Sequence, residues 1–177
     1  MFFILKVINR IVIPALTVYN TIMSWIQILT VIVFAATPVF ELRGAIPLAL
    51  LQYDFDPWTT YGLAVLGNLL PVPILLLGLK YVIQFSQRFP WFHNMFEWWT
   101  ERTQRKHSKN FERYGALALV LFVAIPLPAT GAWTGSLAAV LFAVPFKAAF
   151  PLIMIGVLIS GAIVTTLVSL GIMAAGH

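Results

Sequence analysis

Residues 34–47 read FAATPVFELRGAIP, and they hold the only two charged residues of positions 11–53, Glu41 and Arg43. A charged side chain inside a bilayer costs roughly 2.5–3.5 kcal/mol even on the mild insertion scales, so one kept there usually faces a protein interior, a cavity or a partner charge. Three residues that disfavour a continuous helix flank the pair: Pro38, Gly44 and Pro47. The stretch predicts a helix break beside a membrane-embedded pair of charges.

The composition indicates an integral membrane protein. Of the 177 residues, 60% are hydrophobic and 10% are charged, whereas about a quarter of the residues of a soluble domain are charged. Mean hydropathy is +0.92. Three uncharged runs are each long enough to cross about 30 Å of hydrocarbon, namely 57–79, 114–146 and 148–176. We predict one all-α membrane domain over residues 1–177.

Basic residues are clustered, which indicates topology. Seven of the eleven lie between positions 80 and 114, and such an excess is typical of cytoplasmic segments. We therefore predict an amphipathic, cytoplasmic linker over 85–113 in a multi-pass protein of the prokaryotic inner membrane. Its interleaved aromatic residues favour contact with lipid headgroups at the interface over contact with nucleic acid.

The sequence gives no reason to expect a cofactor or a metal. Cysteine is absent, which excludes disulfides and a thiol nucleophile. None of the three histidines has metal-ligand spacing. There is no Gly-x-x-x-x-Gly-Lys phosphate loop, which argues against direct use of ATP.

The first residues form an amphipathic pattern. Polar side chains up to position 27 fall within a sector of about 120° on a helical wheel. We predict an amphipathic helix over 1–21. It either lies in the headgroup plane, which we favour, or crosses the membrane with its polar stripe against the protein.

Two apolar stretches have the wrong length for whole spans. Residues 22–53 (32 residues) and 114–146 (33 residues) are interrupted by proline and glycine. A half of such a stretch rises only about 17–20 Å as a helix. Each stretch therefore predicts a re-entrant hairpin, which is tolerated where it is buried in protein or lines a cavity. The alternative is one kinked spanning helix with an interfacial tail.

An internal repeat supports the hairpins. An offset of 88 residues places Phe34, Ala36, Pro38 and Pro57 on Phe122, Ala124, Pro126 and Pro145. Each unit, 22–84 and 114–177, would hold a hairpin and one transmembrane helix. One net crossing per unit makes the two units opposite in orientation, as in the inverted repeats of secondary transporters, with the site at their interface.

Four motifs resemble a known family: ELRGAIP at 41–47, GNLLPVP at 67–73, YG at 114–115 and FVAIPLPATGAWTG at 122–135. Together, within residues 35–170, they resemble the prokaryotic small multidrug export proteins. That family is thought to be distantly related to the DedA and VTT membrane proteins. The resemblance implies paired re-entrant hairpins in inverted repeat, and it implies an alternative function as a DedA-like polyprenyl-phosphate or phospholipid translocase or scramblase.

Glu41 and Arg43 are the main candidates for substrate or ion binding. On a regular helix they would point about 200° apart, whereas a non-helical corner can bring them together. Burial disfavours the charged carboxylate and a guanidinium favours it, so Glu41 is suited to carry a coupling proton or a cationic substrate. Arg43 would hold Glu41 or an anionic group. The alternative is an ion pair that only fixes the corner.

The remaining candidates are polar or aromatic residues beside predicted breaks. For ligand contact these are Asn68, Thr130, Trp133 and Thr134. Asn68 has the alternative role of satisfying carbonyls that nearby prolines expose. The Gly-x-x-x-Gly pattern at 131–135 has the alternative of close helix packing. Further helix breaks or structural roles are predicted at Pro71, Pro73, Pro126, Pro128, Gly131 and Gly135.

We expect a secondary active, proton-coupled transporter that exports or translocates a small amphipathic molecule or lipid by alternating access. An enzyme is not expected, because the interior offers one carboxylate, one guanidinium and threonines rather than several convergent catalytic groups. A structural or assembly role is the second alternative. So small a unit gives little lateral shielding, which favours a homo-oligomer in the bilayer.

Overall fold

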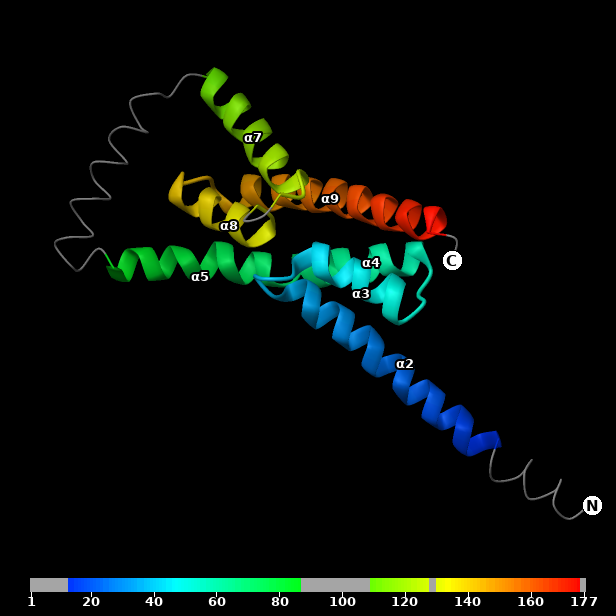
Figure 1. Cartoon of the computed structure of the whole chain (residues 1–177). Coiled ribbons are helices and arrows are strands. Elements are labelled where there is room, and N and C mark those ends of the chain that lie inside the picture. Colours follow the sequence, from blue (N-terminus) through cyan, green and yellow to red (C-terminus); the bar gives the residue numbers. More distant parts are fainter. Residues whose placement is uncertain (1–12, 87–108, 128–129, 176–177) are drawn as a thin grey trace, which may run out of the picture.

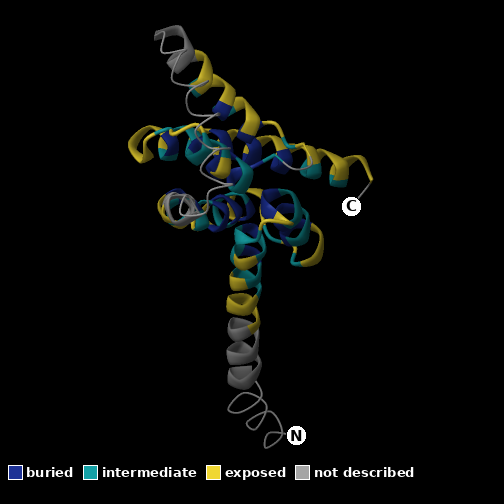
Figure 2. Ribbon diagram, turned by 90° about the vertical axis from the view of Figure 1, so that its left-hand side faces the viewer, coloured by how far each residue is buried: buried dark blue, intermediate teal, exposed yellow. Residues whose placement is uncertain are grey.

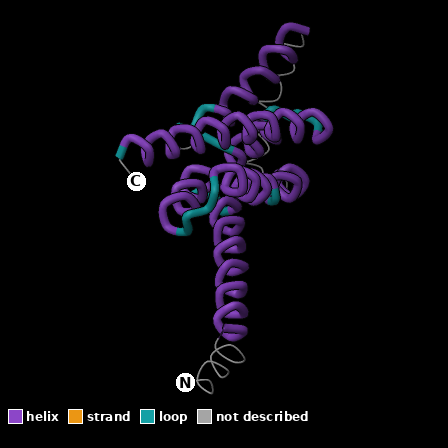
Figure 3. The backbone as a smooth tube through the Cα atoms, turned by 90° about the vertical axis from the view of Figure 1, so that its right-hand side faces the viewer, coloured by secondary structure: helices purple, strands orange, loops and turns teal. Residues whose placement is uncertain are grey.

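A computed structural model describes residues 13–86, 109–127 and 130–175, and every regular element in them is a helix (Figures 1 and 3). The predicted all-α fold class is confirmed to this extent. Outside the described residues lie Pro128, the first twelve residues and most of the predicted 85–113 linker.

The first half begins with α2, Ile13–Ala36, a single helix of 24 residues. It runs without interruption through the boundary predicted between residues 21 and 22, so that boundary lies within a helix. A turn over 37–40 follows and leads into α3, Glu41–Gln52. Twelve residues rise only about 18 Å, which is shorter than a hydrocarbon core of about 30 Å.

The next helix, α4, Pro57–Leu69, begins at a well-formed cap. The Asp56 carboxylate accepts the Trp58 and Thr59 backbone N–H groups, both at 3.0 Å. Hydrogen bonds from the side chain and backbone of Thr59 lower the pKa of Asp56 below its usual value. Pro57 occupies the first turn, where its missing N–H leaves no helical bond unmade.

Only Leu70 separates α4 from α5, Pro71–Ser86. Pro71 and Pro73 lie in the first turn of α5, as predicted for residues that interrupt a helix. Residues Pro57–Gly78 together are long and apolar enough to cross a membrane, as is α9, Phe146–Ala174. These two long segments run antiparallel and side by side in Figure 1.

The second half repeats this helix order. It holds α7, Lys109–Ala124, the short α8, Ala132–Leu141, and α9. Each short helix is followed by a residue with positive φ, Asp54 (φ 50°) or Ala143 (φ 55°), before the long segment begins. The order is the one that an 88-residue repeat requires, while the repeat and the re-entry of its hairpins stay predictions.

Packing centres on α9, which contacts α3, α4, α5, α7 and α8. Buried residues gather where the helices cross, and exposed residues cover the outer faces (Figure 2). Many large apolar side chains are exposed, among them Trp58 (85%) and Met173 (74%). Such apolar surface suits contact with lipid rather than water.

Three of the residues predicted as helix breaks or structural positions do not interrupt a helix, and Gly135 follows the packing alternative. Gly44 and Pro47 lie inside α3, and Gly135 lies inside α8. A Cβ atom at Gly44 would lie 2.8 Å from the Phe40 Cβ atom, and one at Gly135 would lie 2.5 Å from Val123 Cγ2. These glycines therefore allow close packing instead of ending a helix. The chain does turn at Pro38 and Pro126, as predicted.

Candidate functional site

Glu41 is the first residue of α3 and has an unusual backbone conformation. Its φ of 48° lies in the left-handed region, which costs an L-residue other than glycine roughly 1–2 kcal/mol. Phe40, the preceding residue, stacks on Phe34 with the ring centroids 4.1 Å apart. The Glu41 N–H donates to the Thr37 carbonyl at 3.2 Å. The corner thus turns the Glu41 side chain away from α2 and into the protein.

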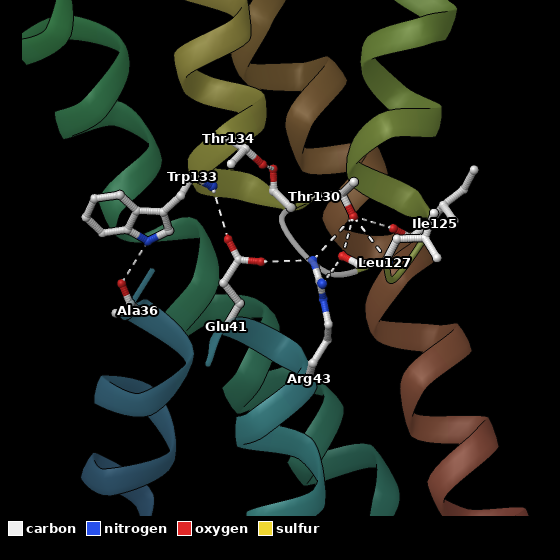
Figure 4. A network of polar contacts seen from close by, with 9 residues as sticks. Ala36, Glu41, Arg43, Ile125, Leu127, Thr130, Trp133 and Thr134 are labelled. Carbon is white, nitrogen blue, oxygen red and sulfur yellow. Dashed lines mark hydrogen bonds and ion pairs between the residues drawn. The ribbon is translucent and has the colours of Figure 1, made fainter. Parts of the chain in front are cut away.

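The Glu41 carboxylate ends at the beginning of α8, in the other half of the chain (Figure 4). Its Oε1 accepts the Trp133 backbone N–H at 3.2 Å. The free N–H groups of a helix N-terminus carry a partial positive charge that favours an anion. The Glu41 side chain is only 8% exposed, so α8 replaces part of the hydration that the carboxylate loses.

Gly131 makes room for this carboxylate. A Cβ atom at position 131 would lie 1.9 Å from Glu41 Oε2, and the φ of Gly131 is 142°. Only glycine adopts such a backbone conformation readily. Glycine is therefore required at position 131 for its backbone conformation and for the space that it leaves to the carboxylate. The sequence predicted only a helix break or a packing position here.

Arg43 extends from α3 into the 125–131 connection of the second half. Its guanidinium donates to the Leu127 carbonyl and, at 3.4 Å, to Thr130 Oγ1. It also pairs with Glu41 at 3.5 Å between Nη2 and Oε2. The Arg43 side chain is 27% exposed, so the pair is accessible from the arginine side and closed on the glutamate side.

Three further candidates surround this pair. Thr130 Oγ1 lies 2.8 Å from the Ile125 carbonyl and 2.8 Å from the Leu127 carbonyl, which fixes the connection that receives Arg43. The Trp133 indole Nε1 donates to the Ala36 carbonyl at 3.1 Å, and so ties α8 to the end of α2. Thr134 Oγ1 donates to the carbonyl of Gly131, the residue directly before α8, at 3.4 Å.

Asn68 makes none of these contacts. It lies near the end of α4 with 1% of its surface exposed, and its Oδ1 atom has no partner among the described residues. The predicted set is thus divided. Glu41, Arg43, Thr130 and Trp133 form one network, Thr134 lies at its edge, and Asn68 is apart from it.

Sequence reasoning missed the backbone groups of the network. The Trp133 N–H and the carbonyls of Ala36 and Leu127 hold the two charges and the indole. Every residue has a backbone carbonyl and every residue except proline has an N–H, so no residue type marks these groups in a sequence. In the sequence, the only signal for these backbone contacts was the predicted helix break in the second half, which matches the break in the first half.

The network joins the two halves through hydrogen bonds to a buried charge. Breaking it on one side would leave a charge poorly solvated, which is costly in an interior. A proton on Glu41 would remove that charge and weaken both the ion pair and the bond to Trp133.

The sequence profile of the small multi-drug export protein family matches residues 41–163. The matched region begins at Glu41, directly after the first corner, and it includes the second corner and the side chains of Glu41, Arg43, Thr130 and Trp133. The chain belongs to this family. The family's description indicates a membrane transporter that exports drugs. No curated protein and no solved structure matches the chain.

Proposed function

We propose that this protein is a proton-coupled secondary transporter that exports or translocates a small amphipathic molecule or lipid. The observation that carries the proposal is the Glu41 carboxylate, held between Arg43 of its own helix and the Trp133 N–H of the other half. Alternating access requires bonds that join two halves in one state and release them in another. This network provides such bonds, because each side-chain bond of Glu41, Arg43 and Trp133 joins a group of the first half to a group of the second half or depends on the charge of Glu41.

Protonation of Glu41 supplies the release step. The charged carboxylate favours the joined state because both of its partners donate to it. The neutral acid loses the attraction to the guanidinium and most of its attraction to the α8 N-terminus. The halves can then separate at the corners, and Arg43 becomes available to a polar group of the substrate.

The test is transport by Glu41→Gln in proteoliposomes with an imposed proton gradient. Glutamine preserves the side-chain size and can still accept the Trp133 N–H, but it cannot titrate. We expect gradient-driven transport to fall to background while the protein stays folded. Asp54→Asn is the matched control, because it makes the same chemical change at an exposed residue in a left-handed conformation that asparagine tolerates.

Normal gradient-driven transport by Glu41→Gln would refute the proposal. If Glu41→Gln and Arg43→Gln lowered thermal stability without any effect on transport, a structural role for the ion pair would replace it.

A further inference from the structure

The charged pair is open to a ligand on one side only. Both carboxylate oxygens of Glu41 are occupied, Oε1 by the Trp133 N–H and Oε2 by the Arg43 guanidinium. A Cβ atom at position 131 would lie 1.9 Å from Oε2, so the backbone of Gly131 also covers this oxygen. The Glu41 side chain is 8% exposed and the Arg43 side chain is 27% exposed. The charge that a ligand meets at this site is therefore positive.

Arg43 keeps hydrogen-bond donors for a ligand. Its contacts with Leu127, Thr130 and Glu41 come from the terminal nitrogens Nη1 and Nη2, and its Nε–H has no acceptor among the described residues. The two Nη2 contacts, at 3.5 Å to Glu41 and 3.4 Å to Thr130, are longer than the roughly 2.7–2.9 Å of a strong charged hydrogen bond. Nε and Nη2 form one edge of the planar guanidinium, and such an edge binds a carboxylate or phosphate through two hydrogen bonds.

Apolar side chains flank the guanidinium (Figure 4). The Thr130 hydroxyl that accepts from Arg43 also contacts the carbonyls of Ile125 and Leu127, so both residues lie close to the charge. Their exposed fractions are 46% and 54%. Exposed apolar side chains in a membrane protein lie among lipid tails rather than in water. The site thus joins a positive group to an apolar surface, and this combination complements an amphipathic anion.

A proton on Glu41 and an anion on Arg43 favour one another. The proton removes the charge that holds Nη2, which frees the guanidinium edge. Carboxylate and guanidinium together have no net charge, and neither do the neutral acid, the guanidinium and a bound anion. Both states therefore avoid an unpaired charge in the interior, which is costly. Among the described residues, Arg43 is the only charged side chain that pairs with Glu41.

We propose that Arg43 binds the anionic headgroup of an amphipathic substrate, whose tail lies on Ile125 and Leu127, and that this substrate binds together with the proton on Glu41. The inference rests on the proposed function and names the substrate class of the same site. A carboxylate or a phosphate group supplies the two acceptor oxygens that the guanidinium edge needs. A cationic amphipath does not belong to this class, because the guanidinium repels it.

Binding without a proton gradient tests this class. The probe is radiolabelled dodecyl methyl phosphate, a diester whose single negative charge is the same at acidic and at alkaline pH. Its equilibrium binding to the full chain is measured in nanodiscs of neutral phosphatidylcholine. Glu41→Gln and the double variant Glu41→Gln/Arg43→Gln both lack the carboxylate and differ only in the guanidinium. We expect at least about tenfold weaker binding by the double variant, because it loses hydrogen bonds to a charged group.

The wild-type chain tests the link to the proton. We expect its affinity for the probe to rise as the pH falls and to approach that of Glu41→Gln, whose affinity stays constant. By reciprocity of the two binding equilibria, the probe then also favours proton uptake. Wild-type affinity that does not rise on acidification, or weaker binding by Glu41→Gln than by the wild type, would overturn the link.

Two further probes define the substrate class. Dodecyltrimethylammonium has the same tail with a positive headgroup, and dimethyl phosphate has the headgroup without the tail. We expect neither to bind the wild type better than the double variant. Binding of the cation that is lost in Glu41→Gln would make the carboxylate the substrate-binding group and overturn the inference. Dimethyl phosphate that binds as tightly as the dodecyl probe would assign the site to a water-soluble anion and overturn the amphipathic class.

Lys147→Gln in the Glu41→Gln background is the matched control, because it removes an exposed positive charge at the beginning of α9. We expect it to bind the probe as Glu41→Gln does. Equal loss at positions 43 and 147 would mean that the probe follows net charge, which would refute a site at Arg43. Should the double variant not fold, Glu41→Gln/Arg43→Lys keeps the charge without the planar edge. We expect severalfold weaker binding by that variant, and unchanged binding would refute the role of the edge.

The binding and transport results fail separately. Normal gradient-driven transport by Glu41→Gln, together with probe binding that depends on Arg43, would refute the proposed coupling and leave the anion site standing. Transport that is lost in Glu41→Gln, together with probe binding that ignores Arg43, would keep the coupling and overturn the substrate class.

Discussion

Glu41 and Gly131 depend on one another across the interface between the halves. The glutamate adopts a left-handed conformation that it would ordinarily avoid, and the glycine leaves the space that the carboxylate then fills. The cost at Glu41 is offset by hydrogen bonds that only this geometry provides. Backbone strain of this kind is commonly found where function fixes the conformation.

At this scale we predict that Gly131→Ala is strongly destabilising. The new Cβ atom would lie 1.9 Å from Glu41 Oε2, and the backbone conformation alone costs about 1–3 kcal/mol. The measurement is thermal unfolding in detergent, followed by tryptophan fluorescence. Gly78→Ala is the control, because a Cβ atom there meets nothing within 4 Å. Unchanged stability of Gly131→Ala would contradict the placement of the carboxylate.

The candidate site was predictable as far as side chains define it. Glu41 and Arg43 stand out because they are charges in an apolar run, and Thr130 and Trp133 because they follow a second break. Their pairing partners were not predictable, since backbone amides and carbonyls leave no mark in a sequence. The second corner carries no charge of its own, and the structure shows that Arg43 supplies one from the first half.

Val123 joins the three helices of the second half. A Cβ atom at Gly135 of α8 would lie 2.5 Å from Val123 Cγ2, and one at Gly156 of α9 would lie 2.6 Å from Val123 Cβ. This valine of α7 therefore packs against two glycines on different helices. Close approach at such small residues holds helices together in a membrane, where lipid gives little hydrophobic drive for association.

These contacts predict selective rescue. Gly135→Ala and Gly156→Ala should each destabilise the protein by roughly 1–3 kcal/mol through overpacking. Val123→Ala removes Cγ2 but keeps Cβ, so it should recover most of the loss in Gly135→Ala and little of the loss in Gly156→Ala. A double-mutant cycle of unfolding free energies measures both couplings. Equal rescue of the two variants would contradict this packing.

Helix breaks show where sequence reasoning fails at the scale of elements. Pro38 and Pro126 mark real turns, whereas Pro47 lies within α3. Proline and glycine lower the intrinsic preference for helix, but tertiary packing decides whether the helix continues. At Gly135 of α8 the space is filled by Val123 of α7, a partner on another helix that the sequence alone did not reveal.

At the scale of the whole molecule, the two corners meet at the centre while the short helices leave it in opposite directions (Figures 1 and 4). An inverted repeat requires such an arrangement, and the repeat itself stays a prediction. The connections after α3 and after α8 would then lie at opposite faces of the membrane.

The repeat predicts opposite labelling of two cysteine variants. Asp54→Cys and Ala143→Cys replace exposed residues in those two connections. In intact cells, a membrane-impermeant maleimide should label one of them, and the other should react only after the membrane is permeabilised. Labelling of both from the same side would exclude the inverted arrangement.

The two halves contribute different chemical groups to the network, and this difference has a genetic consequence. The first half contributes both charged side chains, whereas the second contributes an amide, a hydroxyl, a carbonyl and the space at Gly131. Neither half can stand in for the other, so two copies of the same half cannot assemble this centre. If the halves descend from one duplicated segment, they have become complementary parts that must be inherited together.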